Sequence, residues 1–127
     1  MCRGGSGWAE YAVANHKRAI KFKTDQISWE QAASIQGNLQ TMHDAIVTNG
    51  KFAIGQTVFI QGATSGVGIM GLQIAKALGA SKIIGSSTNE SKLSKLLDYG
   101  ADVLINTSKN DWLNSVLNVT DGKGVDI

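Results

Sequence analysis

The sequence predicts a doubly wound α/β fold, in which a parallel sheet carries helices on both faces. Short apolar stretches typical of strands alternate with helical patterns from residue 57 onward in the 127-residue chain, and parallel strands require crossover connections of this kind. A glycine-rich loop between the first such strand and its helix is the second indication. The last residues begin a fourth strand, so we expect the sheet to be truncated there.

Composition and charge indicate one globular domain and exclude several functions. Hydrophobic residues make up 43% and charged residues 17% of the chain, which suits a single folded core. The net charge of +2 is far below what a nucleic-acid-binding face requires, so we expect no nucleic-acid partner. No apolar run reaches the roughly 18 residues of a membrane span, and no signal segment follows the first methionine. We therefore expect a cytoplasmic protein without membrane contact.

The sequence offers neither disulfide nor metal chemistry. Cys2 is the single cysteine, which excludes an internal disulfide. His16 and His43 are far apart in the sequence, so no spacing typical of metal ligands can be assembled. We predict no metal site.

The first part of the chain predicts a short strand and a long helix. Apolar residues alternate loosely over 8–13, which indicates the strand. Ser28 and Gln31 have the spacing of a capping box, and apolar residues follow at helical intervals, so a helix should occupy 29–49. It should end at Asn49-Gly50, where a residue with positive φ can close the last turn.

The rest of the chain repeats a unit of strand followed by helix. Gly100 should stop the second helix, and Ser108 should cap the third. The predicted strands are 57–61, 82–85, 103–105 and the start of a fourth at 124–127, and the first two helices are 66–78 and 90–99.

The glycine loop over 60–68 predicts a phosphate site. It leaves an apolar strand and opens a helix, and glycines there let an anion approach the unpaired amides of the helix start. A pyrophosphate is expected at this end, and the alternative is a tight turn without a ligand. The candidate binding residues are Ala63, Thr64, Ser65, Gly66, Val67 and Gly68.

Two other phosphate loops fit less well. A nucleoside-triphosphate loop needs a lysine after its last glycine, whereas Val67 follows Gly66. The glycine spacing also resembles short-chain dehydrogenases, which would imply a loop near the N-terminus and a Tyr-x-x-x-Lys pair. Neither tyrosine is followed by a lysine four residues later, so this interpretation is the poorer one.

Seven blocks of sequence follow one another along nearly the whole chain: 7–11, 28–33, the glycine loop, 73–80, 99–102, 105–106 and 122–126. Their order and spacing resemble the medium-chain dehydrogenase/reductase superfamily, specifically its zinc-free quinone oxidoreductase (zeta-crystallin-like) branch. The resemblance implies a Rossmann-type fold. It also implies that 1–25 are the tail of a catalytic (GroES-like) domain and that 26–127 are an incomplete NADP(H)-binding domain.

The sequence departs from this family at several positions. The family's loop usually reads Ala-x-Gly-Gly-Val-Gly, and Ser65 replaces one of its glycines. The serine is small, and its hydroxyl could donate to a phosphate oxygen. Lys23, Gln36 and Ile54 stand where relatives tend to have prolines, which makes these turns less rigid.

The second strand predicts the choice of cofactor. An NAD site places a carboxylate about 20 residues past the first glycine, and Ser87 occupies this position. Ser87, Thr88 and the cation of Lys92 can bind a 2′-phosphate, which favours NADP(H). The resemblance also makes Lys92 a 2′-phosphate ligand, although Lys92 can equally be a solvated helix residue. Thr107 replaces a tyrosine that often packs near the ribose in the family.

The resemblance implies that Thr41 lies beside the nicotinamide. By its spacing alone, Thr41 could equally hydrogen-bond to its own helix. His43 would face away and be a surface or satisfied histidine. We assign no catalytic residue.

The leading hypothesis is the NADP(H)-binding portion of a reductase that passes hydride from NADPH to a small-molecule substrate, a quinone or an activated enone or enal. This chain alone is expected to be incomplete and inactive. The alternative is a non-catalytic dinucleotide-binding module, and a short-chain dehydrogenase is less favoured. A homodimer through the sheet edge, as in relatives, is a further expectation.

Overall fold

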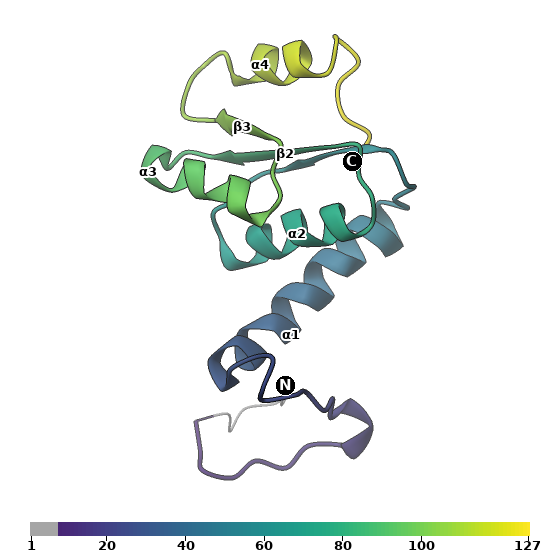
Figure 1. Cartoon of the computed structure of the whole chain (residues 1–127), viewed down its shortest axis with the longest axis vertical. Coiled ribbons are helices and arrows are strands. Elements are labelled where there is room, and N and C mark those ends of the chain that lie inside the picture. Colours follow the sequence, from purple (N-terminus) through teal and green to yellow (C-terminus); the bar gives the residue numbers. More distant parts are fainter. Residues whose placement is uncertain (1–7) are drawn as a thin grey trace. The chain divides into compact units, whose positions relative to one another are not determined.

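The computed structural model describes residues 8–127, which form two compact units, 8–37 and 38–127 (Figure 1). The predicted boundary after residue 25 separates a catalytic-domain tail from a cofactor domain, and it stays a prediction. Cys2, on which the exclusion of a disulfide rests, lies outside the described residues. In chain order the elements are η1 (His16–Arg18), α1 (Trp29–His43), η2 (Asp44–Asn49), β1 (Thr57–Ile60), α2 (Gly66–Ala77), β2 (Lys82–Ser87), α3 (Glu90–Leu93), η3 (Ser94–Tyr99), β3 (Val103–Asn106) and α4 (Trp112–Val119).

The second unit contains a parallel sheet in the order β1-β2-β3. Ile60 pairs with Gly85, and Ser87 pairs with Asn106. The polypeptide therefore leaves all three strands at the same edge of the sheet. Loops that follow parallel strands meet at this carboxyl edge, where ligands of open α/β sheets bind.

The predicted fourth strand lies beside β1 on the side away from β2. The N–H of Phe59 donates to the C=O of Ile127 at 2.7 Å, and the N–H of Ile127 donates to the C=O of Thr57 at 3.2 Å. Asp126 donates its N–H to the same C=O at 3.0 Å, so the segment pairs with β1 without the regular geometry of a strand. The resulting spatial order, β3-β2-β1 and then 126–127, is that of a Rossmann fold.

The core of this unit forms one layer on each face of the sheet. Val58 and Ile60 join the layer that includes α2 and η3, whereas Phe59 joins the layer that includes α4. Alternate residues of a strand point to opposite faces. Figure 1 shows α2 and α3 on one side of the sheet and α4 on the other. The doubly wound α/β prediction is confirmed.

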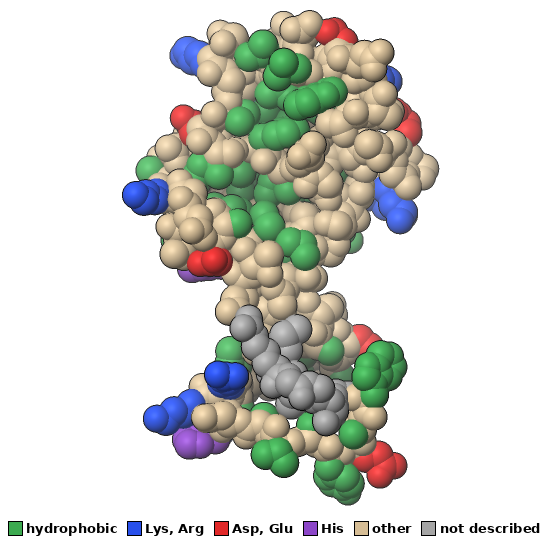
Figure 2. Space-filling model, turned by 180° about the vertical axis from the view of Figure 1, so that it is seen from behind, with side chains coloured by type: hydrophobic (Ala, Val, Ile, Leu, Met, Phe, Trp, Pro, Cys, Tyr) green, Lys and Arg blue, Asp and Glu red, His purple; other side chains and the backbone are tan. Residues whose placement is uncertain are grey.

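Figure 2 shows hydrophobic side chains gathered on one face of the sheet-bearing unit. Lysine, arginine and acidic side chains on this face are scattered around that area. Within residues 8–127, the structure has no helix with the length and apolar character that crossing a membrane takes.

The capping box at the start of α1 is confirmed. The N–H of Ser28 donates to Oε1 of Gln31 at 2.8 Å, and the N–H of Gln31 donates to Oγ of Ser28 at 3.2 Å. Ser28 also donates its hydroxyl to Oε2 of Glu30 at 2.7 Å. This hydrogen bond lowers the pKa of the Glu30 carboxyl.

The end of this helix differs from the prediction. The helix continues to Asn49, but its last six residues, η2, have π-helical hydrogen bonding. Gly50 has a φ of −71°, and the positive φ falls on Lys51 instead, at 51°. Gly50 lacks space for a side chain, since a Cβ there would lie 2.7 Å from the carbonyl oxygen of Ile46. The glycine thus allows a close approach within the helix end.

Two further local predictions are wrong. Residues 8–13 form no strand, because no strand of the described chain pairs with them, and Trp8 and Val13 are fully exposed. Ser108 does not cap α4, because its hydroxyl donates to Oδ1 of Asn106 at 2.7 Å and the helix begins only after Asp111.

The predicted helix over 90–99 is a short α-helix followed by a 3₁₀-helix. Gly100 ends it with a φ of 102°, as predicted. The second strand extends two residues further than predicted, to Ser87.

Candidate functional site

The glycine loop connects β1 to α2 at the carboxyl edge of the sheet. Gly62 turns the chain with a φ of 64°. Ser65 then caps α2, since its Oγ accepts the N–H of Gly68 at 3.0 Å and its C=O accepts the N–H of Ile69 at 2.9 Å. The sequence interpretation missed this cap, although serine before a helix start is the usual signal. The serine that replaces a family glycine thus has a structural role in the loop.

Gly68 lets the helix lie directly on the loop. A Cβ at this position would be 2.6 Å from both the Cα of Ala63 and the carbonyl oxygen of Gly62. Atoms of the backbone cannot move aside as a flexible side chain can. Gly68 is therefore the position at which a glycine is required for loop and helix to meet.

Ala63 holds the loop to the sheet. Its side chain is completely buried, and its N–H donates to the C=O of Ser86 at 2.8 Å. Ala63, a predicted binding residue, therefore supports the loop and exposes no atom to a ligand in this structure.

The first amides of α2 are the donors for an anion. The N–H groups of Gly66 and Val67 have no hydrogen-bond partner in the part of the chain that the structure describes. They begin a helix of 12 residues, whose dipole adds favourable potential for negative charge. A dinucleotide's pyrophosphate could accept hydrogen bonds from these N–H groups, next to the close contact of loop and helix at Gly68.

A polar pocket of about 380 Å³ lies at the carboxyl ends of the strands. It brings together candidate residues from the glycine loop and from the ends of β2 and β3. Gln61, which the sequence interpretation did not single out, also lines it. The residues that line this polar pocket are Gln61, Gly62, Thr64, Ser65, Ser87, Thr88 and Thr107.

Ser87 connects the segments around this polar pocket. Its side chain is 4% exposed, its Oγ lies 2.9 Å from Oγ1 of Thr64 and accepts the N–H of Asn89 at 3.0 Å. Its C=O accepts the N–H of Thr107 at 3.1 Å. The glycine loop and the ends of β2 and β3 are thus joined at one residue.

Lys92 does not line this pocket, although it belongs to the adjoining α3. It is exposed, and its backbone N–H is capped by Oδ1 of Asn89 at 3.3 Å. Glu90, the first residue of α3, accepts a hydrogen bond from Nδ2 of Asn106. The sequence interpretation missed the capping role of Asn89. An asparagine directly before the first helical residue, Glu90, is the signal that could have shown it.

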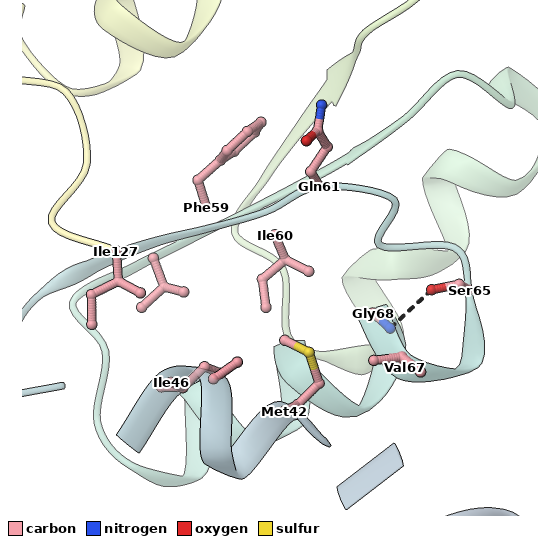
Figure 3. A pocket seen from close by; sticks show the side chains of 11 residues that line it. Met42, Ile46, Phe59, Ile60, Gln61, Ser65, Val67, Gly68 and Ile127 are labelled. Atoms are coloured by element: carbon pink, nitrogen blue, oxygen red, sulfur yellow. Dashed lines mark hydrogen bonds between the residues drawn. The ribbon is translucent and has the colours of Figure 1, made fainter. Parts of the chain in front are cut away.

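An apolar pocket of about 240 Å³ shares Gln61 and Ser65 with the polar pocket (Figure 3). Figure 3 shows Met42 and Ile46 pointing into it from α1 and η2, opposite Ile60 and Ile127. Thr41 is exposed and lines neither pocket. The apolar pocket is lined by Met42, Ala45, Ile46, Val58, Phe59, Ile60, Gln61, Ser65, Val67, Gly68 and Ile127.

Within residues 8–127, no three His, Cys, Asp or Glu side chains come together as a metal site needs. His16 and His43 are both exposed.

A parallel sheet with a glycine loop, free helix amides and a pocket at its carboxyl edge defines a dinucleotide-binding domain. The family model described as zinc-binding dehydrogenase matches residues 66–127. Human quinone oxidoreductase is 30% identical over 121 residues, 95% of this chain and 36% of that protein. An NAD-dependent alcohol dehydrogenase of Sulfurisphaera tokodaii is 33% identical over 119 residues, 94% of this chain and 34% of that protein.

Solved structures agree with these relatives. Escherichia coli quinone oxidoreductase complexed with NADPH matches with a TM-score of 0.72 and 32% identity, over 80% of this chain and 31% of that one. The chain belongs to the medium-chain dehydrogenase/reductase superfamily, a family of oxidoreductases, and corresponds to its nicotinamide-dinucleotide-binding region. It spans about a third of the length of the two curated relatives. The residues described offer no ligand set for the zinc in the family description.

Proposed function

We propose that the protein binds NADP(H) and is the cofactor-binding portion of a zinc-free oxidoreductase that passes hydride from NADPH to a quinone or an activated enone or enal. One observation carries the choice of cofactor. The polar pocket is lined by hydroxyl groups and an amide, and none of its described lining residues is a carboxylate.

The position of Ser87 supports NADP(H) over NAD(H). An NAD site needs an acceptor for the ribose hydroxyls at the end of the second strand, and a carboxylate there repels a 2′-phosphate. Ser87 ends β2 without charge, and Thr88 and Thr107 add hydroxyls that can donate to phosphate oxygens. Lys92 on α3 supplies a cation beside the same strand end.

Glu90 is the acidic residue that follows this strand end. Its carboxylate accepts from Nδ2 of Asn106, and Glu90 does not line the polar pocket. This arrangement leaves the pocket itself without an acidic acceptor for a free ribose diol. It therefore supports the same cofactor choice as Ser87.

The rest of the dinucleotide would follow the loop. The unpaired amides of Gly66 and Val67 would hold the pyrophosphate, and the nicotinamide would supply hydride chemistry when bound. Thr41 beside the nicotinamide remains a proposal from the family. The quinone or enone substrate is proposed from relatives named quinone oxidoreductase.

Titration with NADPH and NADH, followed by nicotinamide fluorescence, tests the proposal. We expect NADPH to bind more tightly. Equal affinities, or tighter NADH, would contradict the cofactor choice, and a failure to bind either would contradict the function. A second measurement follows NADPH oxidation by a quinone. Oxidation would exclude the non-catalytic module, whereas binding without oxidation agrees with both hypotheses, because the chain alone is expected to be inactive.

A further inference from the structure

A polar side chain from α1 lies against the glycine loop, at a position that the family resemblance does not assign. Nδ2 of Asn38 lies 3.1 Å from the point where a Cβ on Gly66 would be. Gly66 is the first residue of α2 and carries one of the two unpaired amides. Asn38 therefore lies at the anion-binding end of α2.

The neighbouring residues on the same face of α1 are apolar. Met42 follows Asn38 after four residues on the same side of α1, and Ile46 follows after four more in η2, which continues this helix. Met42 packs against Gly71 of α2, where a Cβ on the glycine would overlap its side chain, and Ile46 is buried in the core. Asn38 is thus the polar end of a face that otherwise packs against apolar atoms.

Asn38 has no structural partner that explains this position. It is half-buried, and its side-chain amide makes no hydrogen bond with any other residue that the structure describes. The amide keeps some contact with water, since no fully buried side-chain nitrogen or oxygen of the described residues lacks a hydrogen-bond partner. A charged ligand oxygen would be a stronger acceptor for it than this water. A ligand oxygen beside Gly66 would satisfy it.

We propose that Asn38 is a phosphate-binding residue, whose amide donates to the same pyrophosphate as the N–H groups of Gly66 and Val67. This inference rests on the proposed binding of NADP(H). The amide would add a third donor, from a different helix, to two backbone donors that belong to one helix start. Binding would then hold α1 and α2 together at the loop.

The test compares ligands with and without a pyrophosphate. NADPH contains both the pyrophosphate and the 2′-phosphate, whereas 2′-AMP contains only the latter. Both are titrated into the wild-type chain and into Asn38→Ala and Asn38→Asp, by fluorescence for NADPH and calorimetry for 2′-AMP. Gln40→Ala is the matched control, because Gln40 is exposed on the same helix.

We expect Asn38→Ala to weaken NADPH roughly tenfold, since a hydrogen bond to a charged group is lost. Asn38→Asp should weaken it further, because a carboxylate then faces the pyrophosphate. Binding of 2′-AMP should be unchanged in both variants, and Gln40→Ala should bind both ligands as the wild type does. Circular dichroism checks that each variant is folded.

Wild-type affinity for NADPH in both Asn38 variants would overturn the inference. An equal loss for 2′-AMP would also overturn it, because the effect would then be a displacement of the loop. If the wild type binds 2′-AMP and NADPH equally, the pyrophosphate subsite is absent and the Asn38 inference fails while the adenosine pocket stands. If the wild type binds neither ligand, the proposed function itself fails.

Discussion

Ser87→Asp provides the sharpest test of the cofactor choice. The side chain lies at the junction of the glycine loop, β2 and β3, and it is almost fully buried. Its Oγ already accepts the N–H of Asn89 and lies 2.9 Å from Oγ1 of Thr64. An aspartate can accept from both groups, so the new charge has hydrogen-bond partners and the variant should fold.

The magnitude follows from Coulomb's law. A carboxylate and one phosphate charge about 6 Å apart repel by about 0.7 to 3 kcal/mol between bulk-water and near-surface dielectric values. This corresponds to a roughly three- to hundredfold loss of NADPH affinity. NADH lacks the 2′-phosphate and gains an acceptor for its ribose hydroxyls, so its affinity should stay the same or rise.

Ser87→Asn is the matched control, because asparagine has almost the shape of aspartate without its charge. The assay titrates both variants with both cofactors and compares the ratio of the two dissociation constants. We expect the ratio to change for Ser87→Asp far more than for Ser87→Asn. Equal losses of NADPH and NADH affinity, or equal effects of the two substitutions, would show that Ser87 does not meet the adenosine ribose.

Three further substitutions test the loop and the pocket. Gly68→Ala should lower the free energy of unfolding by about 1–3 kcal/mol and weaken NADPH binding, because a Cβ would overlap the loop backbone. Gly66→Ala is the control and should lower it by under about 1 kcal/mol, because its Cβ would meet only the end of a side chain. Urea unfolding measures both, and equal losses would contradict the close approach at Gly68. Thr64→Val should lower stability by about 0.5–1.5 kcal/mol through loss of the contact with Ser87, measured by thermal unfolding; an unchanged melting temperature would contradict this. Lys92→Ala should weaken NADPH less than Ser87→Asp does, and the difference from wild type should shrink in about 1 M salt, since exposed charges are screened; an equal loss for NADH would remove the lysine from the 2′-phosphate site.

The elements that could be predicted are those specified by local sequence. The capping box at Ser28 and Gln31 and the left-handed stop at Gly100 each depend on a few neighbouring residues. The alternation of apolar strands with helices required a parallel sheet, and the loop at its carboxyl edge followed from the glycines. Some short-range features can therefore be inferred from one sequence, although the predicted cap at Ser108 is equally local and is wrong.

Two features that the sequence did not predict correctly depend on distant contacts. A strand at 8–13 needs a hydrogen-bonded neighbour, and no described segment provides one. The extension of β2 through Ser86 and Ser87 escaped prediction because these residues are polar, yet both are buried. Each has a partner, since Ser86 donates to the C=O of Ile60 at 3.4 Å and Ser87 lies beside Thr64.

Most of the candidate site follows from sequence because it is built from strand ends. Five of the predicted residues line the polar pocket, namely Thr64, Ser65, Ser87, Thr88 and Thr107. Asn38 could not be found this way, because its position beside Gly66 depends on the packing of α1 on α2. Asn89 has two contacts here. Its Oδ1 accepts the N–H of Lys92 and so caps α3, and its own backbone N–H donates to Oγ of Ser87.

The two classes of donor in the proposed 2′-phosphate site differ in how they are held. The hydroxyl of Ser87 is buried and bonded to the loop and to α3 before any ligand binds, so a ligand loses little conformational entropy in ordering it. Lys92 is exposed at the end of a four-residue helix, and its ammonium must be ordered against solvent when it binds. Discrimination between the cofactors should therefore come mainly from the fixed strand end, with the lysine adding a smaller, salt-dependent attraction.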